Sequence, residues 1–189
     1  MNELGQQLKI REIALPTLKS KEAALRMEVK KAKVMALEYD DKLKQRIKDM
    51  KDMVRLWVEF DTDLLKLKDS TYSTRIIAGV KIPVLDNLTF DQQEYSLYQK
   101  PDWFPDGMRI LKELTDFSIK RDVSWKSMEI LELARKKTTQ KVNLYEKVQI
   151  PEYQQSISRI KRFLEDEENL SKSAQKILKR RNKEKSAKA

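Results

Sequence analysis

Apolar residues recur every three or four positions through the first third of the chain. With Leu15 as position a of a heptad, sixteen a and d positions follow up to Leu67, and only Glu22 and Arg46 among them are not apolar. The positions between them are rich in Lys, Glu and Asp, so the helix has a single apolar face. A strict seven-residue period predicts left-handed coiling against a partner helix. The pattern therefore predicts an N-terminal coiled-coil helix over residues 1–70.

Two charged residues interrupt this apolar face. Glu22 occupies an a position and Arg46 a d position. Long charged side chains at such positions reach the surface along their apolar stems, or they fix the register of two paired helices. The alternative is that these two residues contact another subunit.

A second apolar pattern covers residues 107–185 and predicts a C-terminal coiled-coil helix, with a frayed tail at 186–189. Its phase shifts by one residue between Val142 and Ile157, near Pro151. Proline lacks an amide hydrogen and crowds the preceding turn, so Pro151 is expected to bend the helix or open it locally. Two apolar faces separated by a break predict an antiparallel hairpin of helices. Separate helices in a homodimeric coiled coil are the alternative.

The predicted fold is all-α dominated: a long antiparallel two-helix left-handed coiled coil with a small β-hairpin in the middle of the chain. The predicted coiled-coil core consists of Leu15, Leu18, Leu25, Val29, Leu43, Met50, Met53, Trp57, Phe60, Leu64, Val142, Tyr145, Ile157, Ile160 and Leu164.

Residues 71–106 differ in composition and form a predicted head. They contain three of the five prolines and six of the chain's aromatic residues. Residues 76–85 read as a strand and Asp86-Asn87 as a turn, followed by residues 88–90 and then 95–98 as the returning strand. A two-stranded hairpin is marginal in water and must pack on the helices or on a partner. The head is either a docking surface or a small core of its own; its candidate docking residues are Ile77, Val80, Ile82, Val84, Phe90, Tyr95, Tyr98, Trp103 and Phe104.

The composition argues against an enzyme. The chain of 189 residues contains no Cys, no His and only 3 Gly. Thiolate and imidazole chemistry, disulfides and glycine-rich phosphate loops are therefore excluded. Neighbouring carboxylates such as Asp61 and Asp63 point to different sides of a helix. No catalytic, cofactor-binding or metal site is expected.

The charge of the chain is concentrated near its end. Residues 172–189 carry eight Lys or Arg and one Glu, a net +7 of the total +10. Such a segment can bind nucleic acid, anionic lipid or an acidic protein cavity. No apolar run approaches the ~20 residues that span a bilayer. The amino terminus also lacks a signal-peptide pattern, so a cytoplasmic protein is expected.

One segment is specific enough to suggest a family. The run Lys136-Lys137-Thr138-Thr139, followed by Val142-Asn143, Glu146 and Ile150-Pro151, resembles the C-terminal helix of the D subunit of the V-type and A-type rotary ATPases. The segments 78–84 (AGVKIPV) and 15–25 are also similar to that family, the second more loosely.

The resemblance implies a central rotor axle that couples ATP hydrolysis or synthesis to rotation and to H⁺ or Na⁺ transport. The two helices would insert into a ring of three A and three B catalytic subunits, while the head would bind the F subunit and the C (or d) subunit that leads to the membrane ring. The chain would be non-catalytic and peripheral to the membrane, without cofactors, nucleic-acid partners or membrane insertion. The implied axle–ring interface consists of Lys136, Lys137, Thr138, Thr139, Lys141, Asn143, Glu146 and Pro151. The alternative is a basic coiled-coil protein that binds nucleic acid or acts as a scaffold.

Overall fold

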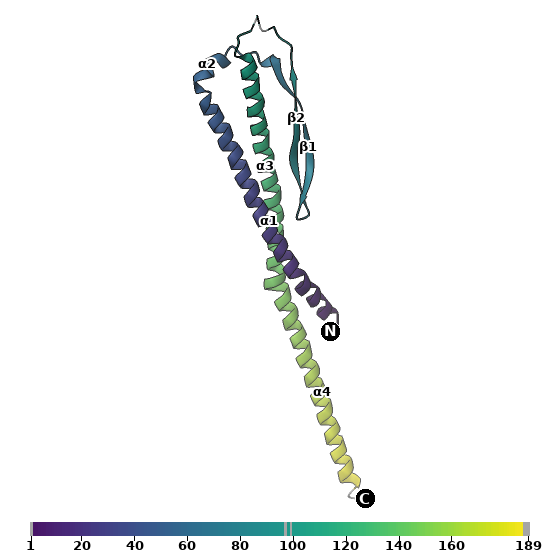
Figure 1. Cartoon of the computed structure of the whole chain (residues 1–189). Helices are drawn as coiled ribbons and strands as arrows, with labels where there is room; N and C mark the ends of the chain where they lie inside the picture. Colours follow the sequence, from purple (N-terminus) through teal and green to yellow (C-terminus); the bar gives the residue numbers. More distant parts are fainter. Residues whose placement is uncertain (1, 97, 99, 187–189) are drawn as a thin grey trace. The chain divides into compact units, whose positions relative to one another are not determined.

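The computed structural model describes residues 2–96, 98 and 100–186 (Figure 1). Its helices are α1 (Asn2–Asp49), α2 (Val54–Trp57), α3 (Phe104–Leu144) and α4 (Ile150–Ser186), and its strands are β1 (Leu65–Ile77) and β2 (Val80–Gln92). Two short 3₁₀ turns, η1 (Lys51–Met53) and η2 (Thr62–Leu64), and one π turn, η3 (Tyr145–Gln149), complete the elements. The predicted fold class, mainly helical with one small β-hairpin, is confirmed.

The chain divides into two compact units. Lys21–Thr138 form the first, here called the hairpin unit. Residues 1–20 and 139–189 form the second, here called the terminal unit. The boundaries fall inside α1 and α3, so each of these helices contributes to both units.

In the hairpin unit, α1 and α3 run antiparallel (Figure 1). Arg46 near the end of α1 pairs with Glu113 near the start of α3, at 3.0 Å. Glu22, earlier in α1, pairs with Arg135, later in α3, at 3.9 Å. Because residue numbers rise along one helix as they fall along the other, the chain folds back on itself in this unit, as the sequence predicts.

The heptad pattern describes the burial of α1 in this unit. Leu25 and Ala36 have no exposed surface. Every other a and d position from Glu22 to Arg46 is at least half-buried, while most residues between them are exposed. Leu25 packs with Leu131 of α3 and Ile82 of β2, so the buried face of α1 meets both the second helix and the hairpin.

The N-terminal helix is shorter than predicted, because α1 ends at Asp49 and not at residue 70. The apolar residues that continue the heptad, Phe60 and Leu64, pack instead with Phe104 and Met108 in a separate core cluster. Residues 65–77 then form a strand. Their run of Thr, Tyr and Ile favours β structure, which tertiary pairing with β2 makes possible.

The β-hairpin exists, but its turn lies at Ala78-Gly79 and not at Asp86-Asn87. Ile77 pairs with Val80, and the two residues between them have positive φ angles of 49° and 76°. Two consecutive positive φ angles give the turn whose twist matches the flanking strands. The single strand predicted for residues 76–85 is therefore divided between the end of β1 and the start of β2.

The hairpin packs on the helices through β2. Ile82 is 8% exposed and belongs to the cluster with Leu25 and Leu131. The hydroxyl of Ser127 on α3 donates a hydrogen bond to the carbonyl of Pro83 at 3.0 Å. Most side chains of β1 are exposed. The helices thus supply the packing that an isolated hairpin lacks.

In the terminal unit the helical path passes through the π turn, which ends two residues before Pro151. A π turn holds one residue more than an α-helical turn, which accounts for the one-residue change of phase in the sequence. The expectation that the helix opens locally at Pro151 is confirmed. Of the predicted tail, residues 187–189 lie outside the described residues.

Candidate functional site

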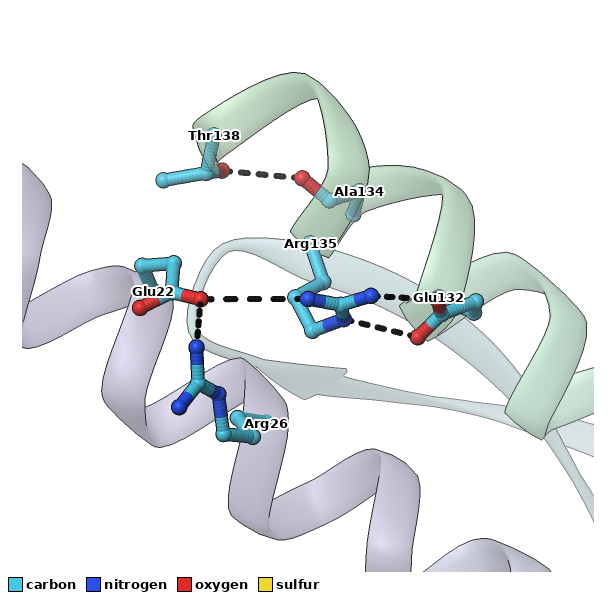
Figure 2. Close-up of polar contacts among 6 residues, drawn as sticks. All are labelled: Glu22, Arg26, Glu132, Ala134, Arg135 and Thr138. Atoms are coloured by element: carbon cyan, nitrogen blue, oxygen red, sulfur yellow. Dashed lines mark hydrogen bonds and ion pairs between the residues drawn. The ribbon is translucent and has the colours of Figure 1, made fainter. Parts of the chain in front are cut away.

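A chain of alternating charges joins the two helices of the hairpin unit (Figure 2). Arg135 donates two hydrogen bonds to the carboxylate of Glu132, at 2.6 and 2.8 Å. Its guanidinium also lies 3.9 Å from a carboxylate oxygen of Glu22, which accepts a hydrogen bond from Arg26 at 2.9 Å. Glu22 therefore has its charge partners within this chain, which favours a register-fixing role over contact with another subunit.

The same is true of the second charged residue in the apolar face. Arg46 donates from Nε and Nη2 to one carboxylate oxygen of Glu113, at 3.2 and 3.0 Å. Asp40 of α1 lies between Lys44 of its own helix and Arg121 of α3. Ion pairs across the helices are thus spread along this unit, where a sliding of one helix past the other would break them.

These pairs hold their carboxylates in the charged form. The hydrogen bond from Arg135 is the main cause that lowers the pKa of Glu132, and partial burial opposes it. The hydrogen bond from Lys44 likewise lowers the pKa of Asp40, with a smaller contribution from Arg121. Both carboxylates are ionised at neutral pH.

Three residues of the predicted axle–ring interface lie at the end of the hairpin unit. Lys136 and Lys137 are exposed. Thr138 is only 7% exposed, and its hydroxyl donates to the carbonyl of Ala134 at 2.9 Å (Figure 2). The lysines are available to a partner, whereas Thr138 packs inward.

The other predicted interface residues belong to the terminal unit. Lys141 and Asn143 are exposed, while Thr139 and Pro151 are half-buried. Glu146 forms an ion pair with Lys19 of α1 at 2.6 Å. A mainly apolar groove of about 510 Å³ lies beside these residues; its lining is Ile10, Ile13, Ala14, Thr17, Leu18, Lys141 and Tyr145.

Arg11 is a connecting residue that sequence reasoning missed. It donates to the side chain of Gln149 in the π turn at 2.7 Å, and its guanidinium carbon lies 4.8 Å from the ring centre of Tyr153. It also donates to the carbonyl and side chain of Gln7, at 3.0 and 2.6 Å. Arg11 falls on a d position when the heptad is extended towards the amino terminus, which is the signal that would have identified it.

Several predicted docking residues form a core. Phe104 is 1% exposed, and its ring centre lies 4.9 Å from that of Trp103 and 5.2 Å from that of Phe60. Trp57 stacks edge-on against Trp103 at 5.2 Å. Tyr95 packs against this cluster as well. These aromatic residues stabilise the end of the helix pair and are not an exposed docking surface.

The remaining head residues divide between the two faces of the hairpin. Ile77, Val80 and Ile82 pack towards the helices. Val84 and Phe90 are half-buried, and Tyr98 is fully exposed.

The exposed apolar residues of the hairpin are on β1: Leu67, in the segment predicted to be helix, and Tyr72 and Ile76, in the predicted head, are 44%, 51% and 64% exposed. The outer surface of β1, defined by these three residues, is the best candidate for docking.

Within the part of the chain that the structure describes, no group of three or more acidic residues converges to bind a metal ion. Among the same residues, no helix has the length and apolar character needed to cross a bilayer.

The fold and its surfaces define a class of protein: a helical hairpin with an attached β-hairpin, whose exposed side chains form candidate binding surfaces. Residues 1–180 match the family described as the ATP synthase D subunit. The chain belongs to this family, and the resemblance to the D subunit of rotary ATPases is confirmed.

Similar proteins agree with this assignment. The D subunit of the V-type ATP synthase of Borreliella burgdorferi is 30% identical over 185 residues, which cover 94% of this chain and 91% of the relative. The D subunit of the V-type ATP synthase of Chlamydia pneumoniae is 31% identical over 166 residues, or 85% of this chain and 79% of the relative. Nothing in these comparisons favours a nucleic-acid-binding or scaffold protein.

Proposed function

We propose that this chain is the central rotor shaft of a V-type or A-type ATPase. Its family places it in the central stalk of a rotary ATPase. The proposal is that it couples ATP hydrolysis or synthesis in a ring of three A and three B subunits to rotation of the membrane ring and to H⁺ or Na⁺ transport. The observation that supports it best is the ion-paired α1–α3 hairpin, with Arg46–Glu113 and Glu22–Arg135 spread along it. Because ion pairs join the two helices, one helix cannot twist without the other. The pair can therefore carry torque.

The shaft does not need chemistry of its own. A shaft without threefold symmetry touches three otherwise equivalent catalytic pockets differently. The differences in contact energy bias the nucleotide affinities of the pockets, and by linkage nucleotide turnover biases the orientation of the shaft. In this mechanism the chain is a non-catalytic subunit that contributes contacts only.

The proposed contacts with the partners are side chains that are exposed in this chain. The ring would be contacted by the exposed Lys136, Lys137, Lys141 and Asn143. The outer surface of β1 would contact the F subunit and the C (or d) subunit that links to the membrane ring. The protein would thus be cytoplasmic and peripheral to the membrane.

Reconstitution with the A and B subunits of the same organism tests this function. The chain has no Cys, so a single Tyr98→Cys substitution at a fully exposed site allows attachment of a bead. With the ring immobilised, ATP is expected to drive stepwise rotation of the bead in one direction. A chain that fails to co-elute with the ring, or a bound chain that stays still while ATP is hydrolysed, would contradict the proposal.

A second experiment tests the docking surface. The double variant Tyr72→Ser/Ile76→Ser should lose co-purification with the F subunit while its helical circular dichroism is unchanged. Val58→Ser is the matched control, because Val58 is 85% exposed and lies outside the hairpin. Unchanged co-purification of the double variant would exclude this surface.

A further inference from the structure

The π turn keeps the apolar stripe of the terminal unit on one face of the helix, as the half-buried residues on either side of it show. Val142, before the turn, and Tyr145, its first residue, are half-buried. After it, Tyr153, Ile157 and Ile160 are half-buried. In sevens from Val142 the next positions would be 149 and 156, yet the apolar side chains are one residue later. The π turn absorbs this extra residue, so the apolar stripe continues along one face.

The π turn has a local cause in Pro151. In a regular α-helix, residue 151 would donate to the carbonyl of Lys147, and a proline ring would crowd that carbonyl. The wider turn avoids the clash, and the amide of Ile150 donates to the carbonyl of Tyr145. Because an isolated π turn is a rare arrangement, further contacts are needed to hold it.

Arg11 supplies these contacts from α1. Its Nε donates to the side chain of Gln149, the last residue of the π turn, at 2.7 Å. Its guanidinium carbon lies 5.8 Å from the ring centre of Tyr145, the first residue of the turn, and 4.8 Å from that of Tyr153 beyond it. One cation thus touches both ends of the turn and the first part of α4.

The part of α4 beyond Ile160 depends on this turn for its orientation. Phe163, Leu170 and Ile177 are 68%, 72% and 55% exposed, and their seven-residue spacing places them on one face. In the terminal unit α4 continues past the start of α1 (Figure 1). Each residue added to or removed from a helix turns everything after it by about 100°. The direction of this exposed stripe is therefore set by how many residues the preceding turn absorbs.

We infer that the π turn sets the direction in which the Phe163–Leu170–Ile177 stripe faces the catalytic ring, with Arg11 as the positioning residue that holds the turn. This inference rests on the proposed function and deepens it.

Two matched single-residue deletions test the role of phase in the complete chain. The first variant lacks the exposed residue Val148 of the π turn and also carries Pro151→Ala. It is expected to form a regular α-helix in which the stripe keeps its original direction. The second removes exposed Lys161 from α4, which keeps the π turn but rotates the stripe by about 100°. Both chains have the same length. Helicity and melting temperature are measured first, to confirm that each variant folds. A chain that lacks Lys147 in place of Val148, again with Pro151→Ala, is a second version of the first variant.

Affinity for the reconstituted A/B ring is the readout. The Val148 deletion should bind as the unchanged chain does, while the Lys161 deletion should bind about tenfold more weakly, as expected when one or two apolar contacts are lost. Equal binding by all three chains would overturn the inference, as would equal weakening by both deletions. Failure of the unchanged chain to bind would instead contradict the proposed function.

Arg11→Gln tests the positioning role. In the unchanged background it should weaken ring binding, because the turn loses the cation that joins its ends. In the Val148-deleted background, where there is no π turn to hold, the same substitution should have little effect. Lys9→Gln, at an exposed neighbour, is the control. An equal effect of Arg11→Gln in both backgrounds would show that Arg11 does not act through the turn.

Discussion

Glu22 and Arg135 face each other across the two helices of the hairpin unit, with 3.9 Å between a carboxylate oxygen and a guanidinium nitrogen. Glu22 occupies an a position of the heptad, where an apolar residue would pack more favourably. Its side chain is 17% exposed and that of Arg135 is 25% exposed. The pair is therefore partly desolvated. It contributes more to fixing the register of the two helices than to the stability of the fold.

Removal of one charge of the Glu22–Arg135 pair should destabilise the protein more than removal of both. Glu22→Leu or Arg135→Leu alone should lower the urea midpoint of unfolding, because the remaining charge stays partly buried and keeps only the partner on its own helix, Glu132 for Arg135 or Arg26 for Glu22. The double leucine variant should recover the midpoint or exceed it, since two apolar residues then face each other. Urea titrations followed by circular dichroism measure this. A double variant less stable than either single one would show that the ion pair itself stabilises the fold.

The free energy of unfolding should depend on pH only under acidic conditions. The pKa of Glu132 is lowered from its ordinary 4.5 by the hydrogen bond from Arg135, and that of Asp61 from 3.8 by the one from Lys100. A carboxylate whose pKa is lower in the folded state than in the unfolded state stabilises the fold at pH values above its unfolded pKa. This stabilisation is lost as the pH falls through the folded pKa. With no His in the chain, stability should be flat between about pH 5 and 8 and fall below pH ~4.5.

Unfolding free energies measured by urea across this pH range test the prediction. Glu132→Gln should be less stable at neutral pH and should lose less stability on acidification, because one of the titrating groups is gone. A steep change between pH 6 and 7 would contradict the assignment of the acid dependence to carboxylates.

The sequence predicted α1 well because heptad spacing reports directly on which side of a helix is buried. Leu25 and Ala36, both on that face, are fully buried. The same pattern failed after Asp49, because apolar residues spaced by three and four also suit the compact cluster around Phe60 and Phe104. Periodicity shows that residues are buried together, and it does not show whether one continuous helix brings them there.

The hairpin turn was misplaced for a related reason. Ala78 adopts a positive φ angle of 49°, which alanine rarely does, so Asp86-Asn87 was the stronger turn signal. With the turn placed at Asp86-Asn87, the predicted strand contains only Ile76 and Ile77 of β1, and Tyr72 lies outside it. Two of the predicted docking residues, Trp103 and Phe104, belong to a core that only the tertiary structure reveals.

Ala78→Asn should stabilise the hairpin. An L-residue in the left-handed region costs about 1–2 kcal/mol, and asparagine tolerates it better because its side chain can bond locally. Asn-Gly is also the preferred pair for this turn. Slower amide exchange in β1 and β2 together with a higher melting temperature would confirm the prediction, and a lower melting temperature would contradict it.

Gly107→Ala should destabilise the aromatic cluster, although alanine favours helix more than glycine does. A Cβ on Gly107 would lie 2.7 Å from Cζ3 of Trp103 and 3.5 Å from Cη2 of Trp57. Displacing these rings should cost about 1–3 kcal/mol, more than the ~1 kcal/mol gained from helix propensity. Tryptophan fluorescence and thermal unfolding measure both effects. At Gly5 a Cβ meets nothing within 4 Å, so Gly5→Ala is the control and should be neutral or stabilising.

Ser127→Ala should loosen the hairpin from α3. Ser127 is 6% exposed, and its hydroxyl donates to the carbonyl of Pro83 in β2 at 3.0 Å. Without that donor the carbonyl loses a hydrogen bond in a partly buried place, which costs about 1–3 kcal/mol. Ser124→Ala is the matched control three residues earlier, because that hydroxyl donates only to the carbonyl of Lys120 in its own helix, at 2.7 Å. Limited proteolysis of β1 and β2 should be faster in Ser127→Ala and unchanged in Ser124→Ala. Equal cleavage of the two variants would mean that the apolar contacts of Ile82 with Leu25 and Leu131 are sufficient to hold the hairpin in place.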